Sequence, residues 1–220
     1  MRDSRLQKPC GNGIINTSYR LENIVMSDMT KEIEFLAEID RMKFIMRQTP
    51  LHDGSRFEND AEHSWHMAMY ALVLRQYAPE GCDCDRAARM SLVHDLVELY
   101  AGDTYAYDAK GYEDKSEREL AAADRIFGML PAELGAELRG LWEEFEACQT
   151  PTARYACCCD RIQPLLLNYQ SGGISWQQHG IRASQVLERN KVVFETLPAL
   201  EPFMRALISD AVKRGWLKEG

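Results

Sequence analysis

A chain of 220 residues, of which 45% are hydrophobic, is long enough to bury a substantial core within one domain. Its formal net charge of −8 and the lack of a dense Lys/Arg run argue against nucleic-acid polymers and anionic membranes as main partners. No apolar run approaches the roughly 20 residues of a membrane span. Three of the seven cysteines are consecutive, Cys157 to Cys159, which is no disulfide framework. We therefore expect a cytoplasmic protein, and a small anionic substrate is still allowed because local charge in a cleft can oppose the net charge.

The first 28 residues differ from the rest of the chain because they show no helical or strand period. They include Pro9, Gly11 and Gly13 among polar and charged residues, a composition that favours loops. We expect residues 1–28 to form a flexible N-terminal extension and residues 29–220 to form a single domain. No segment alternates apolar and polar residues as a half-buried strand would, so the domain is expected to be all-α.

Periodic apolar residues predict a series of helices along this domain. Thr30 is a candidate N-cap for the first helix and Asp60 for the second. Pro50 ends the first helix just before it, and residues 51–59 then form a loop. The expected helices span residues 30–48, 60–77, 83–102, 113–130, 131–145, 151–171, 182–195 and 198–215.

The third of these helices contains a doublet, His94-Asp95, within an otherwise apolar pattern. Burying an imidazole beside a carboxylate is costly unless each group has a partner. A divalent metal ion satisfies both, because neutral imidazole and ionised carboxylate are good ligands for such cations. A single buried histidine can also be satisfied by a backbone carbonyl. The doublet therefore indicates a metal only if other helices supply further ligands.

Two residues on other predicted helices complete a candidate ligand set. His63 lies on the second helix, and Asp160 lies on the long helix late in the chain, flanked by apolar residues. Helix bundles build metal sites from inward-pointing side chains on different helices. Alone, His63 could be a core histidine and Asp160 could pair with Arg161, but together with His94-Asp95 they favour a metal. The nitrogen and oxygen donors suit manganese, iron, cobalt, nickel or zinc.

The order of these residues resembles the metal-binding signature of the HD-domain superfamily, an all-α group dominated by metal-dependent phosphohydrolases. The resemblance covers about residues 33–195, and within the superfamily it points to the bacterial 5′-deoxynucleotidases and their eukaryotic relatives. It implies an HD-type helical bundle with the metal site between helices, and a homodimer. The motifs that carry it are Glu62-His63-Ser64, His94-Asp95-Leu96-Val97-Glu98, Gly102-Asp103 and Asp160-Arg161-Ile162-Gln163.

The resemblance also implies a defined set of metal ligands. One divalent ion, whether manganese, cobalt, iron, nickel, zinc or magnesium, is expected at His63, His94, Asp95 and Asp160. Binuclear members of the superfamily need additional histidines between the two aspartate positions, whereas residues 96–159 contain none. A single metal ion is therefore favoured.

Further roles follow from the resemblance for residues around the ion. Arg47 is expected to contact the substrate phosphate, and Glu98 to place or deprotonate the attacking water; with Asp95 they are the expected catalytic residues. Glu98 follows Asp95 by three positions, so the two side chains project from one helical face. Asp103 is expected to contact a sugar hydroxyl, and His66 is a further candidate substrate-binding residue.

Some of these residues have structural explanations as well. Arg47 could complement a helix dipole, Asp103 could close a turn, and His66 could share a helix face with His63 without sharing its target. Gln48 departs from the family pattern, because the bacterial nucleotidases carry an aromatic residue there that helps select the 2′-deoxy sugar. This departure argues against a strict preference for deoxyribose.

The expected reaction is hydrolysis of a phosphomonoester by a metal-dependent enzyme of the 5′-nucleotidase type, with a nucleoside 5′-monophosphate as the favoured substrate. Two alternatives stay open: another HD-type hydrolase acting on nucleoside triphosphates or alarmones, and a catalytically silent nucleotide-binding module. Alarmone hydrolases of this superfamily carry an acidic pair after the His-Asp doublet, whereas Glu98 is followed by Leu99. A silent relative would more often lack some of the ligands, Arg47 or Glu98.

Overall fold

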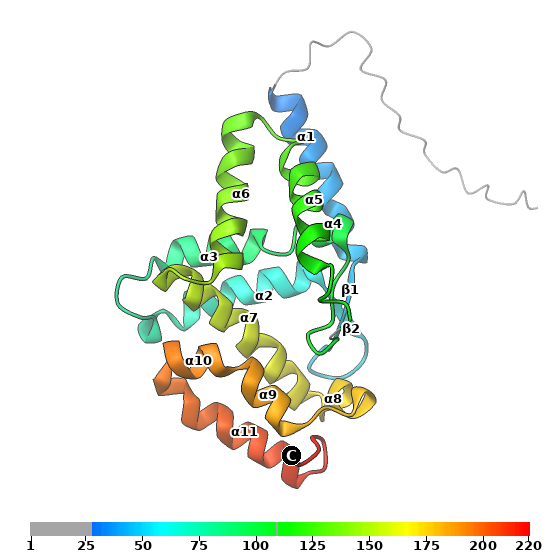
Figure 1. The fold of residues 1–220 in the computed structure, drawn as a ribbon, viewed down its shortest axis with the longest axis vertical. Coiled ribbons are helices and arrows are strands. Elements are labelled where there is room, and N and C mark those ends of the chain that lie inside the picture. Colours follow the sequence, from blue (N-terminus) through cyan, green and yellow to red (C-terminus); the bar gives the residue numbers. More distant parts are fainter. Residues whose placement is uncertain (1–27, 109) are drawn as a thin grey trace, which may run out of the picture.

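The computed structural model describes residues 28–108 and 110–220 (Figure 1). The expected flexible extension, residues 1–28, lies outside these residues apart from Asp28, with which α1 (Asp28–Ile39) begins. Thr30 is therefore inside the first turn of α1 and is not its N-cap. Among the described residues, no helix combines the length and the apolar character that crossing a bilayer requires.

The described chain is predominantly helical, which confirms the all-α prediction. A single pair of short strands interrupts the helices in the part of the chain that the structure covers. After α1 and the 3-10 helix η1 (Asp40–Phe44) come β1 (Met46–Pro50) and β2 (Phe57–Asn59). The remaining elements are α2 (Asp60–Val73), η2 (Arg75–Tyr77), α3 (Cys84–Val93), α4 (Glu98–Ala101), α5 (Lys115–Phe127), α6 (Ala132–Ala147), α7 (Pro151–Gln170), α8 (Ile174–His179), α9 (Ala183–Arg189), α10 (Lys191–Thr196), η3 (Pro198–Leu200) and α11 (Glu201–Lys213).

The β1–β2 hairpin corrects the prediction of a helix through residue 48 and a loop over residues 51–59. Ile45 adopts extended backbone angles, φ −84° and ψ 109°, and β1 then pairs antiparallel with β2, Met46 opposite Asn59. These strands are too short to show an alternating pattern in the sequence. Contacts across the hairpin favour it instead, because the Arg47 guanidinium lies 3.4 Å from the Glu58 carboxylate.

The helix expected over residues 83–102 is also divided in two. α3 ends at Val93, and tight turns follow in which the Leu96 amide donates to the Val93 carbonyl at 3.1 Å and the Glu98 amide donates to the Asp95 carbonyl at 2.9 Å. Bonds of this shorter spacing wind the chain more tightly than an α-helix. Asp95 consequently lies in the connection between α3 and α4, and Glu98 starts the new helix.

The C-terminal third contains more breaks than the apolar pattern predicts. The helix expected over 182–195 divides into α9 and α10 at Asn190, whose side-chain amide donates to the Val186 carbonyl at 2.8 Å. The short helix α8 has no counterpart in the prediction. The double glycine after α7 does end that helix, since Gly172 and Gly173 have φ of 75° and 72°.

The long helix α7 lies at the centre of the fold, where it packs against α2, α3 and α10 (Figure 1). It is buried along most of its length, including Cys157 to Cys159, which are free thiols. The buried Tyr155 hydroxyl donates to the Ala71 carbonyl at 2.9 Å, which ties α7 to α2. The helices that carry the predicted metal ligands therefore share one packed interior.

We expect Tyr155→Phe to lower the free energy of unfolding by about 1 kcal/mol, because a buried hydrogen bond is lost while the aromatic ring is kept. Urea denaturation followed by circular dichroism measures the change. Tyr77→Phe is the matched control, since Tyr77 is largely exposed and the substitution should leave stability unchanged. Equal stabilities of the two variants would contradict a structural role for the Tyr155 hydroxyl.

Candidate metal and substrate site

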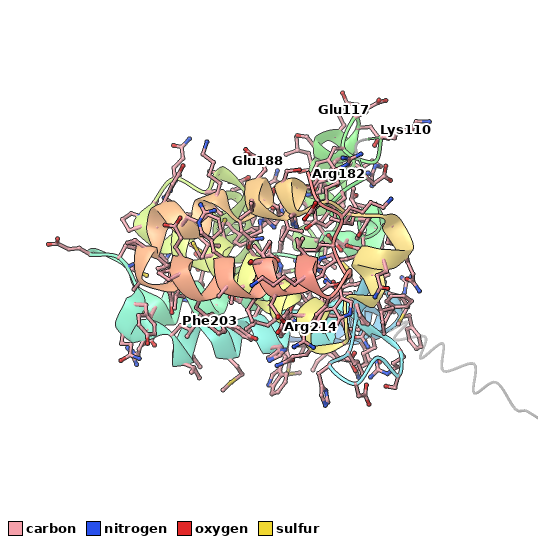
Figure 2. All side chains as sticks on the ribbon, turned by 90° about the horizontal axis from the view of Figure 1, so that it is seen from below. Lys110, Glu117, Arg182, Glu188, Phe203 and Arg214 are labelled. Carbon is pink, nitrogen blue, oxygen red and sulfur yellow. The ribbon has the colours of Figure 1, made fainter. Side chains whose placement is uncertain are left out.

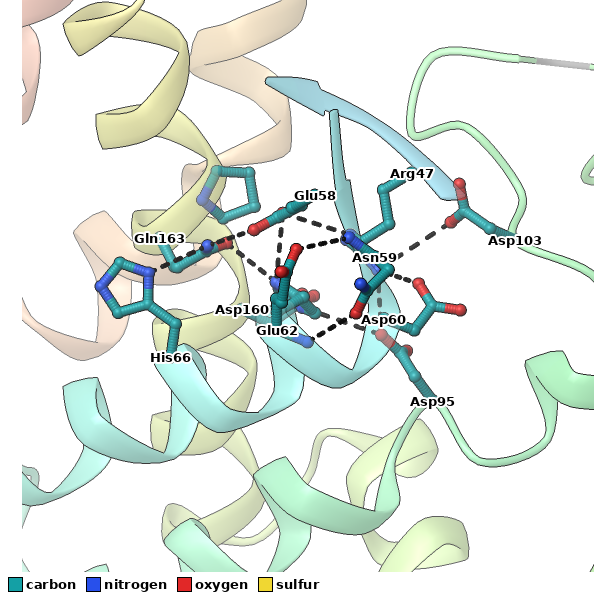
Figure 3. Close-up of polar contacts among 12 residues, drawn as sticks. Arg47, Glu58, Asn59, Asp60, Glu62, His66, Asp95, Asp103, Asp160 and Gln163 are labelled. Atoms are coloured by element: carbon teal, nitrogen blue, oxygen red, sulfur yellow. Dashed lines mark hydrogen bonds and ion pairs between the residues drawn. The ribbon is translucent and has the colours of Figure 1, made fainter. Parts of the chain in front are cut away.

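Side chains from the hairpin and three parts of the helical core meet in one polar cluster (Figure 3). The hairpin supplies Arg47 and Glu58, and α2 supplies residues from its first turns. The junction of α3 and α4 adds further donors, and α7 closes the cluster from the opposite side. The remaining members are Asp60, His63, His94, Asp95, Glu98, Asp160 and Gln163.

The four predicted metal ligands lie next to one another. His63 Nε2 is 3.1 Å from Asp160 Oδ1, and His94 Nε2 is 3.0 Å from Asp95 Oδ1. The two pairs are also in contact, because His63 Nε2 lies 3.8 Å from Asp95 Oδ2 and His94 Nε2 lies 3.9 Å from Asp160 Oδ1. The structure therefore brings the two imidazoles and two carboxylates around a common point.

The hydrogen bonds of the two Nδ1 atoms determine which nitrogen of each histidine faces the cluster. His63 Nδ1 lies 2.8 Å from Gln163 Oε1, and His94 Nδ1 lies 2.9 Å from the Ser91 carbonyl. Carbonyl oxygens only accept hydrogen bonds, so both Nδ1 atoms carry the proton in the neutral rings. Each Nε2 consequently directs a lone pair towards the cluster, which is the arrangement of metal-binding histidines.

Several buried polar atoms of the cluster lack a hydrogen-bond partner among the described residues. They include His94 Nε2, Glu98 Oε2 and Asp60 Oδ2. Burial, followed by repulsion from Asp95, raises the pKa of Asp60 to about 8 and that of Glu98 well above its usual range. Buried carboxylates that lie this close together repel one another, so a cation placed between them is stabilising. The donors present therefore fit a divalent metal ion.

A second acidic group adjoins the histidines. Oxygen atoms of Asp60, Asp95 and Glu98 lie within 4.8 Å of one another. The sequence interpretation of Asp60 as a helix cap is wrong, because Asn59 caps α2 by accepting a hydrogen bond from the Glu62 amide at 3.0 Å. Asp60 instead faces the site. The sequence did contain an indication of this position, because Asp60 precedes His63 by three residues and both therefore lie on one helix face.

Arg47 is surrounded by carboxylates. Its Nη1 lies 2.9 Å from Asp95, 3.3 Å from Asp60 and 3.9 Å from Asp103, in addition to the contact of Nε with Glu58. The strand β1, and not a helix end, positions it, so the helix-dipole explanation does not apply. Asp103 lies in the loop after α4 and shares a cavity wall with Gln48 and Arg47.

Gln163 connects the histidines to the hairpin. Its Oε1 accepts from His63 Nδ1, and its Nε2 donates to Glu58 at 2.8 Å and to His66 Nδ1 at 3.3 Å. His66 therefore reaches the ligand cluster only through Gln163, on the side away from Asp103 (Figure 3). Sequence reasoning gave no role to Gln163 or Glu58; nothing in the loop composition around Glu58 signals its burial.

The model of the HD domain family matches residues 39–201. The chain belongs to the HD domain family. This confirms the identification made from the His63, His94-Asp95 and Asp160 motifs, and the superposition with a solved structure agrees with it. A protein from Magnetospirillum magnetotacticum MS-1, named a predicted metal-dependent phosphohydrolase, is 46% identical with a TM-score of 0.83, covering 87% of this chain and 96% of that one.

Relatives of known name are more distant members of the HD domain family. The human 5′-deoxynucleotidase HDDC2 is 30% identical over 135 residues, which cover 61% of this chain and 65% of that protein. A 5′-deoxynucleotidase of Erwinia tasmaniensis is 32% identical over 127 residues, covering 54% and 64%. The chain thus spans slightly under two thirds of the length of these relatives.

We expect this HD-domain protein to bind a divalent ion through the histidine cluster. Loss of an outer-shell partner costs roughly 10- to 100-fold in metal affinity, so His94→Ala, which removes a direct donor, should cost more. Mn²⁺ titration and the metal-dependent rise in melting temperature measure the effect.

His52→Ala serves as the control, because His52 is exposed in the hairpin loop. Retention of wild-type Mn²⁺ affinity by His94→Ala would contradict the assignment of the cluster as a metal site.

Proposed function

We propose that the protein is a metal-dependent phosphomonoesterase of the 5′-nucleotidase type that removes phosphate from nucleoside 5′-monophosphates. The convergence of His63, His94, Asp95 and Asp160 beside a cavity lined by Arg47 carries the proposal. The 5′-deoxynucleotidase names of the relatives support the substrate class. Within the proposal these four residues hold one divalent ion, which can be manganese, cobalt, iron, nickel, zinc or magnesium.

Glu98 and Arg47 carry out the proton transfer and the charge stabilisation that the reaction requires. A bound divalent ion polarises a phosphate oxygen and lowers the pKa of a water. Glu98 accepts a proton from the attacking water as the general base. Arg47 holds Asp95 in place through the 2.9 Å contact and neutralises negative charge near the phosphate.

Substrate contacts are assigned to the cavity next to this machinery. Asp103 is placed to accept a hydrogen bond from a sugar hydroxyl, and Gln48 lines the same cavity. Because Gln48 is not aromatic, we propose that both ribose and deoxyribose are accepted. His66 contributes indirectly, through its contact with Gln163 at 3.3 Å.

We further propose a cytoplasmic homodimer in which residues 29–220 form one domain. A single hydrophobic core extends from Phe35 to Leu217, which supports one domain. The cysteines of the described residues are all free thiols, as expected in a reducing compartment. One face of α2 exposes a row of apolar side chains that fits self-association: Trp65, Met69, Leu72 and Val73.

Purified protein supplied with Mn²⁺ or Co²⁺ should release phosphate from nucleoside 5′-monophosphates, and Asp95→Ala should abolish the release. Glu98→Gln should lower kcat by roughly 100- to 10,000-fold, the usual contribution of a general base, while retaining metal. Phosphate release and metal content are measured on the same samples.

Glu62→Gln is the control for Glu98→Gln, because Glu62 pairs with Arg56 at the surface. Tight nucleotide binding by the wild type without phosphate release would contradict the proposal and favour a silent binding module.

Replacing Trp65 and Val73 together by glutamate should convert a dimer into a monomer, because two charges would be placed on the apolar row of α2. Sedimentation velocity measures the change in mass. Phe203→Glu is the matched control, since Phe203 is a similarly exposed apolar residue on α11 (Figure 2). An unchanged mass of the double variant would rule out this face as the dimer interface.

A further inference from the structure

Two arginines outside the proposed catalytic set line the cavity beside the metal ligands. Arg161 follows the ligand Asp160 on α7, and Arg189 is the last residue of α9. Both border the cavity whose other wall contains Arg47 and Asp103. They also border a hollow that opens to the surface next to Tyr107. Both arginines therefore line the cavity beside the proposed reaction centre as well as the surface hollow.

Arg189 differs from the other half-buried arginines of the described chain. Within residues 28–108 and 110–220, its side chain makes no hydrogen bond or ion pair. The neighbouring Glu188 is exposed on the outer side of α9 (Figure 2). Every other half-buried arginine pairs with a carboxylate: Arg47, Arg86, Arg118, Arg139, Arg154 and Arg161.

Arg161 leaves most of its hydrogen-bonding capacity open. Its Nη1 donates to Asp160 Oδ2, while the other carboxylate oxygen of Asp160 faces His63. A guanidinium has five N–H donors, and no other hydrogen bond of this side chain occurs among the described residues. Arg161 is therefore held next to the proposed metal ligands by Asp160, and its other N–H groups are available to a ligand.

Arg161 and Arg189 line the same cavity, and positive side chains that share a cavity attract an anion. Burial, followed by repulsion from Arg161, lowers the pKa of Arg189. An arginine at a helix end complements the helix dipole, but that interaction does not require half-burial beside a second guanidinium. Such an arrangement is typical of sites that receive a phosphate, for which arginine offers a planar set of donors.

Arg47 cannot by itself provide the charge that a phosphate requires. Its guanidinium is already shared between Asp95, Asp60 and Glu58 at 2.9, 3.3 and 3.4 Å. A phosphomonoester is close to a dianion at neutral pH. Besides the proposed divalent ion and Arg47, the basic side chains that line the cavity are Arg161 and Arg189.

We propose that Arg161 and Arg189 form an anion subsite that binds the phosphate group of the substrate beside the metal ligands. The inference rests on the proposed phosphomonoesterase function and names two phosphate-binding residues that the family motifs do not assign. In this subsite Arg161 contacts the phosphate from α7, next to the proposed metal ligands, and Arg189 contacts it from α9. Arg47 then serves chiefly to position the carboxylates.

Titration of the Mn²⁺-loaded protein with inorganic phosphate by calorimetry tests the subsite directly. Arg189→Ala should weaken phosphate binding by roughly 10- to 100-fold, the range for hydrogen bonds between charged groups, and Arg189→Lys should recover part of it. Arg154→Ala is the matched control, because Arg154 is a half-buried arginine on α7 that pairs with Glu195 instead. Unchanged phosphate affinity in Arg189→Ala would overturn the proposal.

Kinetics with nucleoside mono- and diphosphates provide a second readout. For a monophosphate, Arg189→Ala should raise KM more than it lowers kcat. A loss confined to the diphosphate would instead place a second anionic group on the arginines and overturn the proposal. If the wild type hydrolyses no nucleotide but its phosphate affinity still depends on Arg189, the proposed function fails while the subsite stands.

Chemical labelling keeps the inference testable if the variants do not fold. Phenylglyoxal modifies accessible arginines, and mass spectrometry of the wild-type protein identifies which ones. Inorganic phosphate should protect Arg189 from labelling and leave the exposed Arg182 and Arg214 unaffected (Figure 2). Equal labelling of Arg189 with and without phosphate would overturn the proposal.

Discussion

The structure depends on one electrostatic constraint, the burial of several carboxylates in a space that also contains two imidazoles. Asp95, Asp160 and Glu98 are all buried, and ionised groups in such surroundings require cations close by. Arg47 supplies one such charge through contacts with Asp95 and Asp60. The lone pairs of the histidines and the unpartnered carboxylate oxygens leave room for a second, doubly charged cation. If these positions served only the packing of α2, α3 and α7, apolar residues would be more stabilising there. The cluster is therefore better explained by a functional role than by a contribution to folding stability.

Two irregular segments of the backbone contribute to this cluster, the turns between α3 and α4 and the β1–β2 hairpin. In a continuous helix over residues 83–102, Asp95 and Glu98 would lie along one stripe, one turn apart. The tight turns after Val93 replace that helix, and oxygen atoms of both residues lie within 4.8 Å of one another and of Asp60. The hairpin has a comparable effect, because β1 carries Arg47 over the start of α2 and β2 leads directly into the Asn59 cap. Both departures from regular helix coincide with the functional residues, as is common where local preference yields to function.

The sequence was sufficient to predict the helical class and the family, because these depend on long apolar periods and on the His-Asp motifs. It also singled out four side chains that the structure places next to one another, His63, His94, Asp95 and Asp160. It was insufficient for features that depend on contacts between distant segments. Glu58 is buried only because Gln163 and Arg47 approach it from other elements. Local propensity also does not encode the short β-strands or the split of α3 from α4. Asp60 was assigned to capping because an acidic residue at a helix start is common for that reason.

Gln163 explains how the separate elements act as one site. Both ends of its amide are used: Oε1 accepts from His63 Nδ1, while Nε2 donates to Glu58 and His66. Because an amide has a donor end and an acceptor end, this arrangement permits only one orientation of the side chain and one tautomer of His63. The same residue therefore fixes the direction of the His63 Nε2 lone pair and ties α7 to the hairpin that positions Arg47. The position of the hairpin and the orientation of His63 therefore depend on the same side chain, because Gln163 contacts Glu58 and His63 at once.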